Sequence, residues 1–279
     1  MFTDSNYGSA PRKFGWCAKQ EKNRGKKVMS KTKSKKIRAD ELLCRQGQVP
    51  DRQAAAVLIL AGQVRSSADH VIAKTSELVD DTVTLIVALP CPYVSRGAYK
   101  LKPALERYLP VLDGLVGLDV GASTGGFTDL MLQAGARKVY TVDSGRGQLH
   151  DRLRRDPRVI SYEQTNARLL PADFLPEKVD LITMDVSFIS ATALLPAAAQ
   201  FLRPDGLAFI LVKPQFEAAR ADVEPGGVVR NPAVIEACIA KVKSAGAILG
   251  WQPLDTLASP ITGPKGNQEY VVVFRSENR

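Results

Sequence analysis

Residues 115–143 read LVGLDVGASTGGFTDLMLQAGARKVYTVD and constrain the fold more than any other stretch of the chain. Two short apolar runs, at 115–120 and 139–142, have the composition of buried parallel strands. Between them lie a glycine-rich turn and a helical segment, 127–134, which Gly135 is expected to end. The stretch therefore predicts a strand–turn–helix–strand unit of an α/β sheet.

The ligand of this unit is indicated by its glycines and by the acid that ends it. Glycine lets the backbone approach a ligand closely, and the start of a helix offers unpaired N–H groups. Asp143 follows Gly121 by 22 residues, about the spacing at which an acid binds a ribose diol in nucleotide-binding folds. The spacing G-x-S-T-G-G differs from the dinucleotide pattern, and the P-loop lysine is missing. A ribose ligand without a polyphosphate favours S-adenosylmethionine; in the simplest alternative, the glycines only form a tight turn.

A hydrolase is a second interpretation of the same residues. Positions 121–125 also fit G-x-S-x-G, the nucleophile elbow in which Ser123 would attack a substrate. That mechanism needs a histidine far downstream, after an acid, but only His150 follows, 27 residues later and in a polar stretch. The hydrolase interpretation is therefore much the weaker one.

The composition bounds the class of protein. A chain of 279 residues, 45% of them hydrophobic, can bury one large core or two smaller ones. The longest apolar run, 54–61, is far shorter than the roughly 20 residues that span a bilayer, and the polar, basic N-terminus does not resemble a signal peptide. Four cysteines, at positions 17, 44, 91 and 238, lack C-x-x-C spacing. We interpret them as reduced thiols of a cytoplasmic protein and expect no zinc or other metal site.

The net charge of +9 is concentrated at the N-terminus. Residues 1–38 contain 12 Lys/Arg and 2 Asp/Glu, whereas the remainder has a net charge of −1. A basic tail over 1–36 is typical of disordered segments, which either contact nucleic acid or remain solvated. Met29 precedes Ser30 and a lysine cluster, so an N-terminal extension, or a start placed too early, would account for the first 28 residues.

Residues 37–89 have the pattern of a small α+β domain, with helices opening at 38–43 and covering 53–61, and strands at 63–65 and 82–88. R-x-D-x-L-L at 38–43, D-R-x-x-A at 51–55 and L-x-G-x-V at 60–64 resemble the S-four-type RNA-binding domain, named from a small-subunit ribosomal protein. The resemblance implies RNA contacts by Arg38, Arg52, Gln53 and Lys74. Arg65-Ser66-Ser67 depart from the turn usual in this family, and a small helical domain with surface arginines is the alternative.

Residues 90–97 are expected to form a linker, and 98–279 a second domain. Apolar runs alternate with helical segments along it, which indicates a mostly parallel, Rossmann-like sheet. Its later helices are expected at 194–202 and at 233–245, where Gly246 ends the second one. Two last strands, at 248–259 and 270–275, are expected to close this sheet with one antiparallel member. Four positions follow apolar runs: Gly121, Asp143, Asp185 and Lys213. Because such sheets bind ligands at the carboxyl ends of their strands, these positions predict one shared site.

Several motifs occur together within 37–275: SRGAYKL, DVGASTGGFTD, MDVSFIS, LVKPQFE with GGVVRNP, and GNQEY. In this combination the chain resembles the TlyA family of ribosomal RNA 2′-O-methyltransferases, also labelled haemolysin A-like, which joins the RNA-binding domain to an FtsJ-like methyltransferase domain. The resemblance implies a catalytic tetrad, Lys100, Asp185, Lys213 and Glu269. It also implies an S-adenosylmethionine site formed by Gly121, Ser123, Gly125, Gly126, Phe127, Thr128, Asp143, Asn166 and Asp185.

The implied reaction is methyl transfer to a cytidine 2′-hydroxyl in 16S rRNA, 23S rRNA or both, with ribosomal RNA or ribosomal subunits as partners and no membrane. A ribose hydroxyl needs a base within about 2.6–3.2 Å to take its proton. Lys213 is our candidate for this base. A nearby cation, Lys100, and burial would lower the pKa of Lys213 and favour its neutral amine. The acids Asp185 and Glu269 would oppose this lowering, and the sequence does not decide which effect is larger. The alternatives are ordinary salt bridges in place of a tetrad, an RNA-binding assembly factor without catalysis, and a membrane-active haemolysin.

Overall fold

The computed structural model describes residues 35–60, 62–66, 70–87, 91–263 and 265–277. By its internal contacts the chain divides into an N-terminal unit, Met1–Leu89, and a C-terminal unit, Pro90–Arg279, and each is described by itself. The predicted basic tail lies outside the described residues as far as position 34, and Lys36 already belongs to the first strand. No helix within the described ranges is both long and apolar enough to cross a membrane.

Within its described residues, the N-terminal unit contains two helices and two small antiparallel ribbons. Its elements are β1 (Lys36–Arg38), α1 (Ala39–Arg45), α2 (Arg52–Leu60), β2 (Val64–Ser66), β3 (Leu78–Asp80) and β4 (Leu85–Val87). β1 pairs with β3 and β2 with β4, and buried apolar side chains such as Leu42, Ile59 and Leu85 join helices and strands in one core. The sequence pattern does not predict β1 or β3, because β1 runs directly into α1 and β3 lies in the polar stretch between the two predicted strands.

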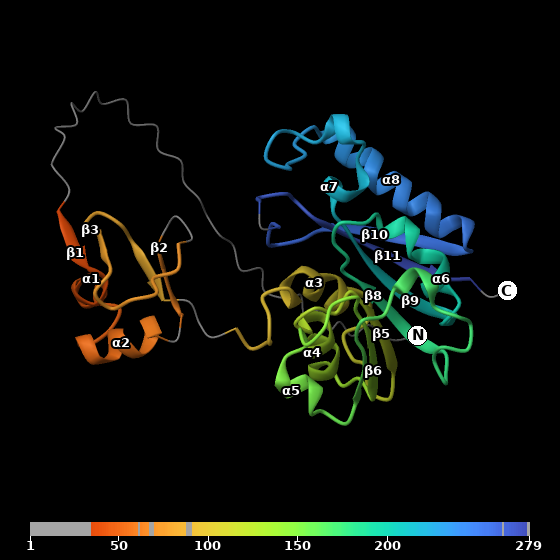
Figure 1. Ribbon diagram of the computed structural model, residues 1–279, viewed down its shortest axis with the longest axis horizontal. Coiled ribbons are helices and arrows are strands. Elements are labelled where there is room, and N and C mark those ends of the chain that lie inside the picture. Colours follow the sequence, from red (N-terminus) through yellow and green to blue (C-terminus); the bar gives the residue numbers. More distant parts are fainter. Residues whose placement is uncertain (1–34, 61, 67–69, 88–90, 264, 278–279) are drawn as a thin grey trace, which may run out of the picture. The chain divides into compact units, whose positions relative to one another are not determined.

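The C-terminal unit is built on one seven-stranded sheet (Figure 1). Its helices and strands are α3 (Ala98–Tyr108), β5 (Val116–Val120), α4 (Gly126–Gln133), β6 (Lys138–Val142), α5 (Asp151–Arg154), β7 (Val159–Tyr162), η1 (Ala167–Leu169), β8 (Val179–Met184), η2 (Ala191–Ala193), α6 (Leu195–Ala199), β9 (Leu202–Val212), α7 (Pro214–Glu217), η3 (Arg220–Asp222), α8 (Pro232–Ile248), β10 (Trp251–Ala258) and β11 (Tyr270–Ser276). The strand order is β10-β11-β9-β8-β5-β6-β7. Only β11 runs against its neighbours, which confirms the predicted mostly parallel sheet with one antiparallel strand.

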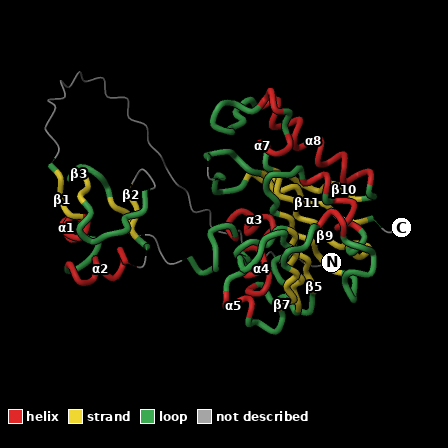
Figure 2. The backbone as a smooth tube through the Cα atoms, in the orientation of Figure 1, coloured by secondary structure: helices red, strands yellow, loops and turns green. Residues whose placement is uncertain are grey.

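Helices cover both faces of this sheet (Figure 2). On one face, Leu101 of α3 and Met131 of α4 pack in a cluster with Val139 of β6. On the other, Leu195 of α6 packs in a cluster with Tyr140, the next residue of β6. Successive strand residues thus serve opposite layers, as the two-residue period of a strand requires. Both faces being covered, the carboxyl ends of β5, β6, β8 and β9 are the part of the sheet open to a ligand.

The structure corrects two element boundaries. The sequence predicts that Gly246 ends the last helix, but α8 continues to Ile248 and β10 begins only at Trp251. Gly246 serves packing instead, since a Cβ there would lie 2.5 Å from the ring of Phe274 in β11. The helix predicted over 194–202 is shorter, because α6 ends at Ala199 and Leu202 already pairs with Val179 of β8 as the first residue of β9.

Candidate active site

Three predicted cofactor residues follow neighbouring parallel strands: Gly121 follows β5, Asp143 follows β6 and Asp185 follows β8. The Gly121 amide donates to the carbonyl of Val142 at 2.8 Å, and the Asp185 amide donates to the carbonyl of Val120 at 3.0 Å. These hydrogen bonds continue the sheet ladder one residue beyond the strands. The three residues therefore lie side by side at the carboxyl edge of the sheet.

The Asp143 carboxylate is oriented by the glycine turn. The Ser123 amide donates to its Oδ2 at 2.8 Å, and the Gly145 amide donates to its Oδ1 at 2.7 Å. The turn can reach Asp143 because Gly121 and Ser123 both adopt positive φ, 82° and 49°. Asp143 stays partly exposed, and each carboxylate oxygen can accept a further hydrogen bond. This donor and acceptor arrangement fits the two hydroxyls of a ribose.

Three other predicted cofactor residues hold the loops around this turn. Asn166 is exposed and caps η1, where its side chain accepts a backbone N–H at 3.1 Å. A Cβ at Gly125 would lie 2.2 Å from the Leu153 side chain, so glycine lets α5 pack closely. A Cβ at Gly126 would lie 3.0 Å from the Ala98 amide, so glycine also lets α3 begin close to α4.

Phe127 and Thr128 lie in the interior, and Thr128 has no exposed surface. The Thr128 hydroxyl donates to Asp119 at 2.7 Å, and the Thr183 hydroxyl donates to the other oxygen of that carboxylate at 2.9 Å. Burial raises the pKa of Asp119 to about 6, although both hydroxyls favour its charged form. We infer that Phe127 and Thr128 stabilise the glycine turn by packing in the interior rather than by contacting the cofactor. Sequence reasoning missed Asp119, although an acid inside a buried strand is itself a signal.

The four predicted catalytic residues meet at this edge. Lys213 Nζ lies 2.6 Å from Asp185 Oδ1, while Lys100 Nζ lies 3.7 Å from Asp185 Oδ2 and 2.8 Å from Glu269 Oε2. Their side chains are only 1–20% exposed. The result is a row of alternating charge, Lys213–Asp185–Lys100–Glu269, in a largely dehydrated place where each charge is compensated by its neighbour.

Topology brings these side chains together across long stretches of sequence. Lys213 follows β9 and Glu269 precedes β11, and the register places Val212 opposite Tyr270. Lys213 and Glu269 are the next residues beyond this pair, so they lie close together where β9 ends and β11 begins. Lys100 comes from the first turn of α3, which packs against α4 and β11.

The two lysines have different electrostatic surroundings. Burial lowers the pKa of Lys100, but the carboxylates of Asp185 and Glu269 outweigh this effect and raise it above the ordinary value. Lys100 is therefore a fixed cation at neutral pH. Lys213 faces one carboxylate, Asp185, and its amine also donates to the hydroxyl of Ser187 at 2.8 Å. Ser187 belongs to the motif MDVSFIS, but the sequence alone indicated no role for it.

The loop after β8, which carries Asp185 and Ser187, also carries an exposed aromatic side chain, Phe188. Phe188 is 91% exposed and has a φ of 66°, a conformation that bulky residues rarely adopt. Its ring lies 5.4 Å from that of Phe216, and the Lys213 amine lies 5.9 Å from the same Phe216 ring. A large exposed ring beside a charged site offers a flat apolar face to a nucleobase. The signal for it was MDVSFIS, where an apolar residue follows Asp185 by three positions.

In the N-terminal unit, the predicted RNA contacts gather around the start of α1. Arg38 donates to both oxygens of Asp40, at 3.0 and 2.7 Å, and Arg52 donates to one of them at 3.0 Å. The hydrogen bonds from Arg38 lower the pKa of Asp40 to about 2, against the effect of burial and with help from Arg52. Gln53 is exposed beside Arg52, and Lys74 is exposed in a loop that hydrogen-bonds to the Asp40 amide. The guanidinium groups are thus held in place at the surface of this unit.

Comparison with known proteins gives several matches. Residues 93–276 match the family described as FtsJ-like methyltransferase. A Mycobacterium tuberculosis protein named 16S/23S rRNA (cytidine-2′-O)-methyltransferase TlyA is 42% identical over 88% of this chain and 91% of its own. Hemolysin A of Brachyspira hyodysenteriae is 37% identical over 85% of this chain and 99% of its own. A solved structure from Streptococcus thermophilus, described as a candidate hemolysin, has a TM-score of 0.68 at 38% identity and covers 87% of this chain and 89% of its own.

Proposed function

Because the chain belongs to the TlyA family of proteins with an FtsJ-like methyltransferase domain, we propose that it methylates the 2′-hydroxyl of a cytidine in ribosomal RNA. The relative from Mycobacterium tuberculosis is named for 16S and 23S rRNA, and 16S rRNA, 23S rRNA or both are the proposed substrates here. The observation that carries this proposal is the charged row Lys213–Asp185–Lys100–Glu269 beside the glycine turn. Such an enzyme acts in the cytoplasm, where ribosomes are assembled.

The residues at the glycine turn fit S-adenosylmethionine as the methyl donor. The partly exposed Asp143 carboxylate would accept from the ribose hydroxyls, and Asn166 lies on the loop after β7, where an adenine is held in the proposed site. When bound, S-adenosylmethionine supplies a sulfonium methyl carbon, to which the ribose oxygen bonds as the carbon–sulfur bond breaks. The remaining chemistry falls to the side chains of the chain itself.

We assign Lys213 as the base that takes the proton of the 2′-hydroxyl. It faces a single carboxylate and the Ser187 hydroxyl, whereas Lys100 is shared by two carboxylates and has a raised pKa. Asp185 contacts both amines and so sets their positions, and the buried Glu269 fixes Lys100. The retained charge of Lys100 would stabilise the oxygen as it becomes negative.

The exposed ring of Phe188 gives the first prediction. A nucleotide whose 2′-hydroxyl reaches Lys213 must leave its helix, and Phe188 offers a surface on which the extruded base can stack. We expect Phe188→Ala to lower kcat/KM for RNA about 10- to 100-fold, since stacking on an aromatic residue contributes about 1–3 kcal/mol. Steady-state kinetics with ribosomal subunits measure this effect. Phe188→Tyr keeps an aromatic ring and should retain activity. If the wild type, Phe188→Ala and Phe188→Tyr have equal kcat/KM, Phe188 does not stack on the substrate base.

A second prediction concerns the N-terminal unit. Arg52→Ala should weaken binding to ribosomal RNA and reduce the slope of log affinity against log salt by about one unit, because one phosphate contact is lost. Asp40 keeps its bonds to Arg38, so the unit should remain folded. Filter binding at several salt concentrations measures the slope. Arg45→Ala, at the opposite end of α1, is the matched control; an equal loss in both variants would argue against a localised RNA contact.

The proposal as a whole is tested by incubating the purified protein with methyl-labelled S-adenosylmethionine and isolated ribosomal subunits. Label in 16S or 23S rRNA is expected, together with cofactor binding measured by calorimetry. An RNA-binding assembly factor without catalysis would bind subunits but show neither label nor cofactor binding. Release of dye from liposomes in the same preparation would instead favour the membrane-active alternative.

A further inference from the structure

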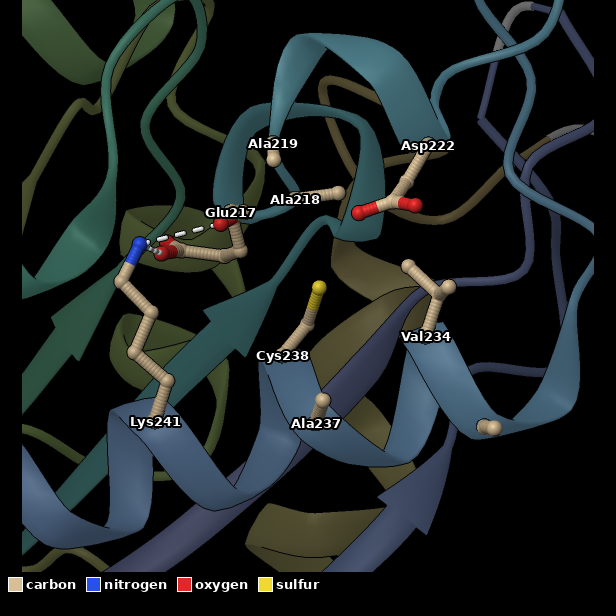
Figure 3. A pocket seen from close by; sticks show the side chains of 9 residues that line it. Glu217, Ala218, Ala219, Asp222, Val234, Ala237, Cys238 and Lys241 are labelled. Atoms are coloured by element: carbon tan, nitrogen blue, oxygen red, sulfur yellow. Dashed lines mark hydrogen bonds and ion pairs between the residues drawn. The ribbon is translucent and has the colours of Figure 1, made fainter.

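A buried glutamate joins the two loops that carry Asp185 and Lys213, two members of the charged row. Glu217 ends α7, and its side chain is 2% exposed. Its Oε1 accepts from the Ala191 amide at 2.6 Å, and its Oε2 accepts from the Ser190 hydroxyl. Lys241 of α8 reaches the same carboxylate at 3.1 Å, and its amine also donates to the Glu217 backbone carbonyl at 3.0 Å (Figure 3).

Glu217 and its partners Ser190 and Ala191 belong to different catalytic segments. Ser190 and Ala191 end the loop after β8, which carries Asp185, Ser187 and Phe188. Glu217 itself ends the segment after β9, which begins with Lys213. The two segments also meet through the ion pair and hydrogen bond of Lys213 and the ring contact of Phe188 with Phe216, which lie within the site itself. Glu217 therefore links the two segments from outside the site.

Packing alone does not secure this link. A cavity of about 310 Å³ lies beside Glu217, between the α7–η3 segment and the first half of α8 (Figure 3). Asp222, Val234 and Cys238 also line it. A carboxylate buried at the wall of a cavity is costly unless donors compensate it, and here a backbone amide, a hydroxyl and a half-exposed ammonium group do so. The loop after β8 is thus held to α7 by directed hydrogen bonds to Glu217, in addition to the apolar packing of Ile189 and Ala191 in the core.

We propose that Glu217 is a positioning residue for the methyl transfer: it holds the loop of Asp185, Ser187 and Phe188 against the segment of Lys213. The inference rests on the proposed function, because the geometry it maintains is that of the assigned base and its partners. Displacements of about 1 Å in such a site can cost on the order of 100-fold in rate. Loss of Glu217 should therefore lower kcat without touching the cofactor turn, which lies after β5 and β6.

Glu217→Ala tests this role. We expect kcat at saturating substrates to fall on the order of 10- to 100-fold. The dissociation constant of S-adenosylmethionine should change much less, because the Asp143 carboxylate keeps its bonds to the turn although the loop of Asp185 is loosened. Glu217→Gln should recover most of the rate, because an amide can still accept from the Ala191 amide and donate to the Ser190 hydroxyl. Asp180→Ala is the structural control: Asp180 accepts the Val116 amide at 2.8 Å, at the opposite end of the sheet. It should lower the melting temperature without lowering kcat at temperatures where the protein stays folded.

Hydrogen exchange read by mass spectrometry gives a result that does not depend on activity. In Glu217→Ala, amides of 186–192 should exchange faster, while those of the β5 and β6 peptides should not change. If the wild-type protein methylates no RNA, the proposed function is wrong. The exchange data would still show whether Glu217 holds the loop. Unchanged exchange in 186–192, or a kcat for Glu217→Ala equal to that of Asp180→Ala, would overturn the positioning role.

Discussion

Lys213→Ala is expected to lower kcat for methyl transfer on the order of 10³-fold, the range that a general base contributes. The variant removes the amine that lies 2.6 Å from Asp185 and donates to Ser187, and it leaves the glycine turn intact. Binding of S-adenosylmethionine should therefore stay at the wild-type level. Rapid-quench measurements with labelled cofactor and ribosomal subunits, with calorimetry for cofactor binding, would separate the two quantities.

Two further variants test whether Lys213 acts as a base or only as a charge. Lys213→Arg keeps a cation next to Asp185, but a guanidinium cannot accept a proton, so this variant should be as inactive as Lys213→Ala. Lys178→Ala, which removes an exposed amine that donates to the Gln200 carbonyl, should be fully active. If Lys213→Arg keeps more than about a tenth of the rate, the residue acts through its charge and the base lies elsewhere.

Gly121→Ala is expected to abolish measurable binding of S-adenosylmethionine. Gly121 has a φ of 82°, and a Cβ at this position would lie 2.6 Å from the Asp185 carbonyl oxygen and 3.0 Å from a methyl group of Val186. The backbone must move away from both, which displaces the turn that orients Asp143. The left-handed conformation adds a cost of about 1–3 kcal/mol to the free energy of folding. Calorimetric titration and thermal unfolding measure the two effects.

A second glycine separates strain from the clash. Gly114 has a φ of 77°, but nothing lies within 4 Å of a Cβ there, and it precedes β5 at the far end of the sheet. Gly114→Ala should lower stability by the cost of the left-handed conformation alone and leave cofactor binding intact. Wild-type affinity in Gly121→Ala would mean that this turn is not the cofactor site.

Sequence alone predicted the sheet because its strands include apolar runs of four to six residues, as in β5 to β8. It missed β1, which runs directly into α1, and β3, which lies in a polar stretch. It misplaced the end of α8, because Gly246 faces Phe274 rather than a turn. A glycine needed for close packing and a glycine that ends a helix look the same in a sequence. Only the tertiary contact distinguishes them.

The site was predictable in part for the same reason. Positions after strands had to share one edge, so Gly121, Asp143 and Asp185 could be grouped from spacing. Lys100 and Glu269 could not, since neither follows a parallel strand, and only the family motifs connected them with the rest. Asp119 is unusual as an acid inside an apolar strand, but its bond to Thr183, 64 residues away, could not be inferred from the sequence. The bond of Glu217 to Ser190 is likewise long-range and leaves no local pattern.

The identity of the methylated nucleoside tests the proposed chemistry most directly. Ribosomal subunits treated with the wild-type protein and labelled S-adenosylmethionine would be digested to nucleosides and analysed by mass spectrometry. We predict 2′-O-methylcytidine from the wild type and none above background from Lys213→Ala. A label on a base atom, or 2′-O-methylcytidine at the wild-type level from Lys213→Ala, would contradict the assignment of this site.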